Sequence, residues 1–156
     1  MIKKALQICQ KDGFAYLSST ILGSLIYRSI DFLDNIRIGK TRRERKERFI
    51  KKEINGNLFL LDLKDKGICQ DLILDGIREV KTTEMMKNIV RDGDVIVDVG
   101  ANIGYYTLLV ADLIGDQGLV YALEPVPDNI KLLRKNIKIN NYSNIKVFPI
   151  GAGAKQ

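Results

Sequence analysis

Two acidic side chains and two glycines have the residue types and the spacing of a ligand-binding turn. Asp98 follows the apolar run 95–97, and Gly100 and Gly104 come shortly after it. Glycine lets the chain turn sharply and lets a ligand approach the backbone closely. Glu124 comes 20 residues after Gly104. In a βαβ unit an acid at that distance lies beside the first turn and can accept hydrogen bonds from ribose hydroxyls. The pattern therefore predicts a nucleoside ligand.

The residues inside the turn favour a nucleoside over a dinucleotide. The dinucleotide fingerprint G-x-G-x-x-G has a middle glycine that lets a pyrophosphate approach the backbone. Here Ala101, Asn102 and Ile103 stand between the two glycines. A side chain at Asn102 suits an uncharged adenosine with an amino-acid tail better than a pyrophosphate.

Alternating strand and helix patterns position these residues. The run 95–97 lacks polar alternation, which is typical of a strand in the middle of a parallel sheet covered on both faces. A helix is expected over 105–113, a second strand over 119–124, a second helix over 128–138 and a third strand over 145–150. A further helix over 82–90 precedes the first strand. Pro149 cannot donate to a ladder, so the third strand should end there or lie at an edge.

The segments 97–107 and 120–128 resemble the FkbM-type methyltransferases, class I enzymes that use S-adenosyl-L-methionine (SAM). The resemblance is strong over 94–140 and weaker over 56–93. It implies that Asp98 and the 100–104 turn hold the methionine end of SAM, that Glu124 holds the ribose and that Pro125 lies near the adenine. The predicted cofactor-binding residues are Asp98, Gly100, Ala101, Asn102, Gly104, Tyr105, Glu124 and Pro125.

Several of these residues also have plainer interpretations. Asp98 could cap the turn through hydrogen bonds to nearby backbone N–H groups. Glu124 could be a solvated strand end. Tyr105 is as well suited to helix packing as to ligand contact. No residue is a convincing catalytic base, so the catalytic residues stay unassigned. A metal site is not expected, because the chain has two cysteines and no histidine.

The predicted fold class is α/β, a Rossmann-like class I methyltransferase sheet present as its N-terminal half. The resemblance implies a seven-stranded sheet ordered 3-2-1-4-5-7-6, of which the chain supplies strands 3-2-1, preceded by a helical segment and a β-hairpin. Strand 1 would then be an exposed apolar edge, prone to self-association through 94–99. We expect a fragment that lacks strands 4–7 and is inactive alone.

The charge distribution suggests three regions: a basic helical extension (1–48), a hairpin and helix subdomain (49–81) and a partial SAM-binding domain (82–156). Residues 1–52 hold 13 basic and 5 acidic residues, whereas 53–156 hold 12 and 14. The basic segment 37–52 could bind an anionic membrane surface, but a solvated helix is favoured. Asn55-Gly56 predicts a type I′ hairpin turn, and a helix is expected over 71–77.

The predicted activity is SAM-dependent methyl transfer, with O-methylation of a small-molecule, sugar or lipid-linked acceptor as the family-based expectation. An NAD(P)-binding oxidoreductase and a non-enzymatic module for anionic surfaces are the alternatives. Nucleic acid is not favoured as a partner, because no aromatic residues interleave the basic run. The longest uncharged stretch, 14–27, has 14 residues, short of the ~20 that span a bilayer. A cytoplasmic location, with peripheral membrane contact as a variant, is expected.

Overall fold

The computed structural model describes residues 48–153 and, before them, residues 29, 32, 33, 36 and 39. The chain divides into two compact units, 1–46 and 47–156, and only the second is described below. The predicted helical extension over 1–48 therefore lies outside the described residues, apart from Arg48 and those five positions. Of the basic segment 37–52, residues 39 and 48–52 are described, and 49–52 belong to a strand. The boundaries at 49–81 and 82–156 stay predictions. In the described part, no helix is long and apolar enough to cross a membrane.

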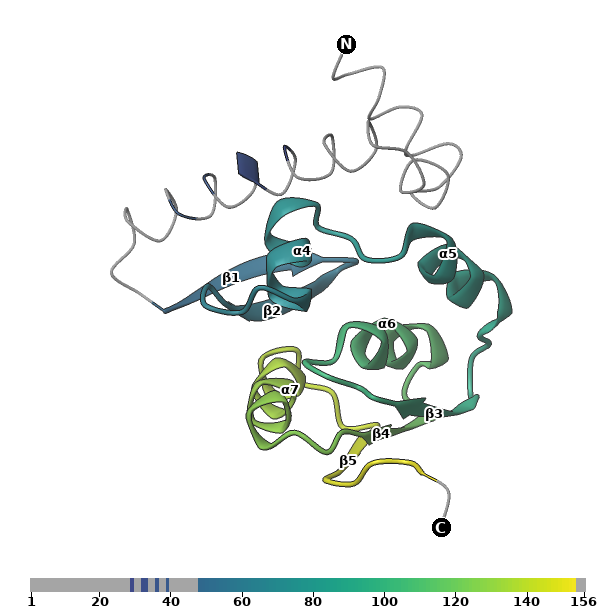
Figure 1. The fold of residues 1–156 in the computed structure, drawn as a ribbon. Coiled ribbons are helices and arrows are strands. Elements are labelled where there is room, and N and C mark those ends of the chain that lie inside the picture. The colour runs from purple at the N-terminus through teal and green to yellow at the C-terminus, as the bar shows by residue number, and fades with distance from the viewer. Residues whose placement is uncertain (1–28, 30–31, 34–35, 37–38, 40–47, 154–156) are drawn as a thin grey trace. The chain divides into compact units, whose positions relative to one another are not determined.

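The second unit has a hairpin, then helices that alternate with parallel strands (Figure 1). Its elements are β1 (Phe49–Ile54), β2 (Asn57–Asp62), α4 (Ile68–Leu74), α5 (Val80–Ile89), β3 (Val95–Val99), α6 (Tyr105–Ile114), β4 (Leu119–Leu123), α7 (Pro127–Ile139) and β5 (Ile145–Phe148).

The three parallel strands lie in the order β3-β4-β5, which confirms the predicted 3-2-1 half-sheet. Asp98 pairs with Ala122 and Val99 with Leu123, so β3 and β4 end side by side. Helices α6 and α7 cover one face of this sheet (Figure 1). On the other face Val95, Val97 and Val99 are 65%, 58% and 59% exposed. The expected cover on both faces is therefore absent among the described residues, because their helices pack on one side.

The hairpin turns as its sequence predicts. Asn55 and Gly56 have φ angles of 49° and 77°, the pair of positive angles that a type I′ turn requires. β2 packs against both α4 and α7. Phe59 and Leu61 are buried in the same cluster as Leu108 and Leu133 of the sheet-covering helices. The hairpin and the sheet layer thus share one hydrophobic core.

Two asparagines, one buried and one half-buried, join the hairpin to α7. Asn136 is fully buried, accepts a hydrogen bond from the Leu60 N–H (2.8 Å) and donates one to the Ile103 carbonyl (2.9 Å). Asn140 accepts from the Leu58 N–H and donates to the Leu58 carbonyl, both at 2.8 Å. These bonds supply partners for polar backbone atoms along β2 that pairing with β1 leaves unused. They fix the hairpin over α7 in one position.

Helix α4 begins and ends three residues earlier than the predicted 71–77. The Asp65 carboxylate accepts hydrogen bonds from the N–H groups of Gly67 (2.6 Å) and Cys69 (3.1 Å), which organises the chain for an early helical start. Gly76 then takes a left-handed conformation with φ at 71°, which ends the helix. The prediction was wrong here because it assigned no capping role to Asp65.

We expect Asn136→Leu to lower the free energy of unfolding by about 2–5 kcal/mol, because two buried polar backbone groups would lose their partners. Urea unfolding followed by circular dichroism measures this. Asn88→Leu is the matched control, since Asn88 is exposed on α5, and it should change stability by about 0.5 kcal/mol or less. Equal stability of the two variants would show that the Asn136 bonds do not hold the hairpin.

Candidate cofactor site

The carboxyl ends of β3 and β4 lie beside the starts of α6 and α7, where open α/β sheets bind ligands. The turn that leaves β3 has positive φ angles at Gly100 (83°), Asn102 (51°) and Gly104 (98°). The N–H groups of Gly100 and Ala101 both donate to the Leu123 carbonyl, at 2.9 and 3.0 Å. These bonds hold the turn against the end of β4.

The two glycines of the turn serve different purposes. A Cβ added at Gly100 would meet no atom within 4 Å, so open space lies in front of this backbone. A Cβ added at Gly104 would lie 2.6 Å from a Leu133 methyl and 2.9 Å from a Leu108 methyl. Gly104 therefore lets α6 pack closely on α7. Gly100 leaves room for a ligand, and no side chain caps the start of α6 beside it.

Asp98 is held by the first turn of α6. The Thr107 hydroxyl donates a hydrogen bond to its carboxylate at 2.5 Å. Burial raises the pKa of Asp98; the Thr107 hydrogen bonds lower it, and the negative charge of Glu124 raises it further. The raised pKa means that the fold alone disfavours the charged carboxylate. A cationic ligand group beside Asp98 would relieve that penalty.

Glu124 is a buried connector rather than the solvated strand end considered above. Only 4% of the Glu124 residue is exposed to solvent. One carboxylate oxygen accepts from the Asn102 N–H at 2.8 Å. The other accepts from the Val126 N–H (2.9 Å) and the Asn129 amide (3.2 Å). An ionised carboxylate offers about four acceptor positions, so most of its capacity is already used within the protein.

The remaining predicted residues fall into two groups. Ala101 and Tyr105 are buried, at 5% and 2% exposure, whereas Pro125 is exposed. The Tyr105 hydroxyl donates to the Arg78 carbonyl and contacts the Thr83 hydroxyl at 3.0 Å. The Tyr105 side chain thus packs between α6 and the chain before α5, so its ring is not available to contact a ligand. Pro125 lies where the chain leaves β4, close to the chain after β5.

Two residues that the sequence analysis missed hold the predicted acids. Thr107 orients Asp98, and Asn129 donates to Glu124. Each lies in the first turn of the helix that follows its acid, and helix starts face the strand ends in a βαβ unit. A polar residue at that position in each helix is the signal that would have identified them.

Comparison with known protein families covers much more of the chain than the turn after β3. The model of the TRM5/TYW2 methyltransferase domain matches residues 50–155, from the hairpin through β5. The chain belongs to this family. Its class I methyltransferase fold is the one predicted from the sequence.

Solved structures and curated relatives that are similar to the chain include further methyltransferases. TYW2 from M. jannaschii, in complex with AdoMet, is 29% identical, with a TM-score of 0.52 over 66% of this chain and 43% of that one. Trm5b from Pyrococcus abyssi shares the fold, at 23% identity and a TM-score of 0.52 over 66% of this chain and 28% of that one. A protein-L-isoaspartate O-methyltransferase from Ignicoccus hospitalis is 35% identical over 65 residues, which are 42% of this chain and 30% of that protein. The chain thus spans less than a third of that curated relative.

These findings correct two predictions and confirm one. The FkbM resemblance was wrong, since the TRM5/TYW2 model matches instead. The residues that suggested the FkbM family lie around the turn after β3 and around the end of β4, within the segment that the TRM5/TYW2 model matches. SAM as the cofactor is confirmed for the family, because the TYW2 structure holds AdoMet.

The predicted partners were also wrong. A small-molecule or glycan acceptor was favoured over nucleic acid, but TRM5/TYW2 family members act on tRNA and the isoaspartate methyltransferases act on proteins. The small-molecule acceptor was taken from the mistaken FkbM resemblance, and nucleic acid was not favoured because the N-terminal basic run lacks aromatic residues. The alternatives of an oxidoreductase and a non-enzymatic module gain no support.

We expect Asp98→Asn to raise the melting temperature at pH 7, by roughly 2–4 °C for each kcal/mol of relieved burial cost. Asparagine keeps an acceptor for the Thr107 hydroxyl but removes the buried charge. The penalty is present above the raised pKa of Asp98 and disappears as the pH falls through it toward the ordinary 3.8. The difference between variant and unmodified chain should therefore shrink on acidification. Thermal unfolding between pH 7 and pH 4 measures it.

The control for that comparison is Asp116→Asn, because Asp116 is exposed just after α6. It should leave the melting temperature unchanged at every pH. A variant Asp98→Asn that is less stable than the unmodified chain at pH 7 would mean that the Asp98 charge stabilises the fold.

Proposed function

We propose that the chain carries the cofactor-binding half of a SAM-dependent methyltransferase whose acceptor is RNA. The family match over residues 50–155 carries this proposal, and the open space in front of Gly100 supports it. The acceptor class follows from the action of TRM5/TYW2 family members on tRNA. The isoaspartate methyltransferase relative, which matches only 65 residues, favours a protein acceptor less strongly.

The residues of the site fit SAM chemically. The backbone at Gly100 is open to close approach, and the uncapped N-terminus of α6 favours an anionic group such as a carboxylate. Asp98 is a carboxylate suited to a cationic group. We assign the methionine end of SAM to this part of the turn. Pro125, exposed beyond β4, would lie along the adenine.

Glu124 would act on the ribose mainly by holding the turn. Its bonds to the Asn102 and Val126 N–H groups fix both walls that the ribose would contact. A remaining acceptor position would then serve a ribose hydroxyl. We therefore expect replacement of Glu124 to weaken SAM binding and also to loosen the turn.

The chain's residues would contribute positioning more than chemistry. Bound SAM supplies an electrophilic methyl group on a sulfonium. Holding that group in line with a nucleophilic acceptor atom lowers much of the activation barrier, because the reacting groups are oriented before the reaction begins. The fixed turn supplies the order on the cofactor side. We name no catalytic base.

The test of cofactor class is calorimetry of the chain with SAM, S-adenosylhomocysteine and NAD. We expect micromolar to millimolar binding of the two adenosyl compounds, consistent with about −8 to −4 kcal/mol, and none of NAD. Binding of a fluorescent tRNA transcript or of an isoaspartyl peptide, measured by anisotropy with S-adenosylhomocysteine present, then distinguishes the acceptors. Binding of NAD without SAM would overturn the cofactor proposal, and binding of the peptide alone would overturn the RNA proposal.

A glycine pair tests where SAM binds. Gly100 and Gly93 have φ angles of 83° and 79°, and a Cβ at either meets nothing within 4 Å. Alanine at either position should cost similar backbone strain, about 1–2 kcal/mol. Only Gly100→Ala adds a methyl group in the ligand's space, so it should weaken SAM binding by about tenfold or more, or about 1.4 kcal/mol. Equal SAM affinities of Gly100→Ala and Gly93→Ala would place the cofactor elsewhere.

A further inference from the structure

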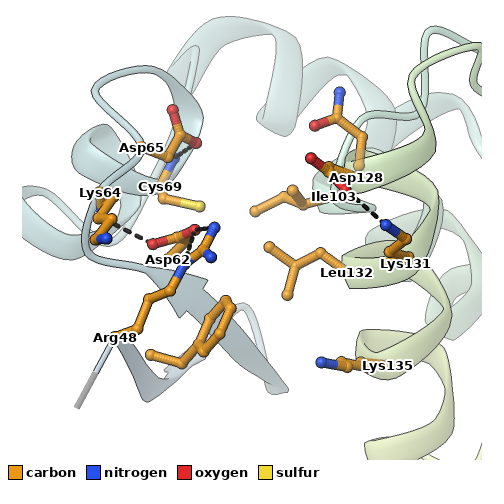
Figure 2. Close-up of a pocket in the computed structure, with 12 residues that line it drawn as sticks. Arg48, Asp62, Lys64, Asp65, Cys69, Ile103, Asp128, Lys131, Leu132 and Lys135 are labelled. Carbon is orange, nitrogen blue, oxygen red and sulfur yellow. Dashed lines mark hydrogen bonds and ion pairs between the residues drawn. The ribbon is translucent and has the colours of Figure 1, made fainter.

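A cleft of about 480 Å³ lies between the hairpin and α7 (Figure 2). It adjoins the cofactor turn at Ile103 and meets the Glu124 network at Asn129, whose amide donates to that carboxylate. Cys69 forms an uncharged part of its wall, because burial raises the pKa of its thiol far above the ordinary value. Its lining residues from the hairpin side are Arg48, Phe49, Asp62, Lys64, Asp65 and Cys69.

The acidic side chains of the cleft already have hydrogen-bond or ion-pair partners within the protein. Asp62 accepts hydrogen bonds from the Arg48 guanidinium at 2.6 and 2.9 Å. Burial alone would raise the pKa of Asp62, but the bonds from Arg48 and the Lys64 N–H outweigh it and lower the pKa. Asp128 pairs with Lys131 at 2.9 Å. Asp65 accepts from backbone N–H groups at the start of α4.

Two ammonium groups of the cleft, those of Lys64 and Lys135, form no ion pair within 4 Å among the described residues. At longer range, the charge of Lys64 helps to lower the pKa of Asp62. Figure 2 shows Lys135 reaching from α7 toward the hairpin. Its ammonium lies 5.4 Å from the centre of the Phe49 ring, which the Arg48 guanidinium also contacts at 5.1 Å. Cation–π contact of this kind holds a lysine in place without neutralising it.

Helix α7 extends this positive surface. It carries four basic residues and one acid, although residues 53–156 as a whole hold more acids than bases. Arg134 and Lys138 are exposed beside Lys131 and Lys135. Positive charge is therefore concentrated along α7, next to the cleft.

We propose that this cleft, through the ammonium groups of Lys64 and Lys135, binds phosphate groups of the RNA acceptor backbone. The inference rests on the proposed function and assigns the surface that holds the acceptor. Lysines that contact phosphates fix the position of a nucleic acid without reading its sequence. A phosphate in the cleft would bring the RNA next to the Glu124 network and hence to the cofactor.

The extent of the family match favours RNA over protein for this surface. Lys64 and Lys135 are 71 positions apart. The isoaspartate methyltransferase match covers 65 residues, so it cannot include both lysines. The TRM5/TYW2 match over 50–155 includes both of them.

The experiment measures binding of a fluorescent tRNA transcript to the chain by anisotropy, from 50 to 200 mM salt. The double variant Lys64→Ala/Lys135→Ala should bind about tenfold more weakly at low salt, and its slope of log affinity against log salt should fall by about two. Lys81→Ala/Lys87→Ala, on exposed positions of α5, removes the same charge elsewhere. This control should stay within about twofold of the unmodified chain, since it keeps the cleft's phosphate contacts.

Calorimetry with SAM on the same variants separates this proposal from the proposed function. SAM binding should be the same in the unmodified chain and both double variants. Equal loss of tRNA affinity in the two double variants, or no loss in either, would overturn the cleft proposal and leave the cofactor assignment standing. An unmodified chain that fails to bind tRNA but binds an isoaspartyl peptide through Lys64 and Lys135 would also overturn it.

A charge-conserving variant guards against a structural artefact. Lys135→Arg keeps a cation over Phe49 and should retain tRNA binding within about twofold, because the phosphate contact needs only the charge. If Lys135→Arg loses as much affinity as the double variant, the cleft does not act as a cation site and the proposal fails.

Discussion

The candidate site depends on the buried carboxylate of Glu124. It joins the Asn102 N–H in the turn, the Val126 N–H after β4 and the Asn129 amide on α7. Asn102 has a positive φ of 51°, a conformation that non-glycine residues adopt at a cost. A charge-assisted hydrogen bond to its N–H offsets that cost. One side chain thus fixes the turn, the end of β4 and one wall of the cleft.

Packing then limits how the turn can move. Gly104 lets α6 pack closely against Leu133 of α7, and Asn136 on α7 holds the carbonyl of Ile103. The same Asn136 also holds β2 through the Leu60 N–H. The cofactor turn, α7 and the hairpin are therefore positioned by shared contacts. A shift of the hairpin would disturb the turn, although the two are far apart in sequence.

Local features of this fold were predictable from the sequence, and features that depend on distant contacts were not. Asn55-Gly56 specifies its turn through backbone conformation alone, and the strand order follows from the βαβ repeat. The early start of α4 depends on the Asp65 side chain, and the burial of Glu124 depends on Asn129. The cleft joins Lys64 to Lys135 only because the hairpin packs on α7. No pattern within either segment contains that information.

The wrong family assignment has the same physical origin. An acid, a glycine turn and a second acid are what the binding of an adenosyl ligand requires. Enzymes that act on unrelated acceptors can therefore share these features. Acceptor choice needs surface outside the turn. In this chain the hairpin supplies Arg48, Phe49 and Lys64, and α7 supplies the facing wall. The residues proposed to hold the cofactor and those proposed to select the acceptor thus lie on different elements, and Asn129 both lines the cleft and donates to Glu124.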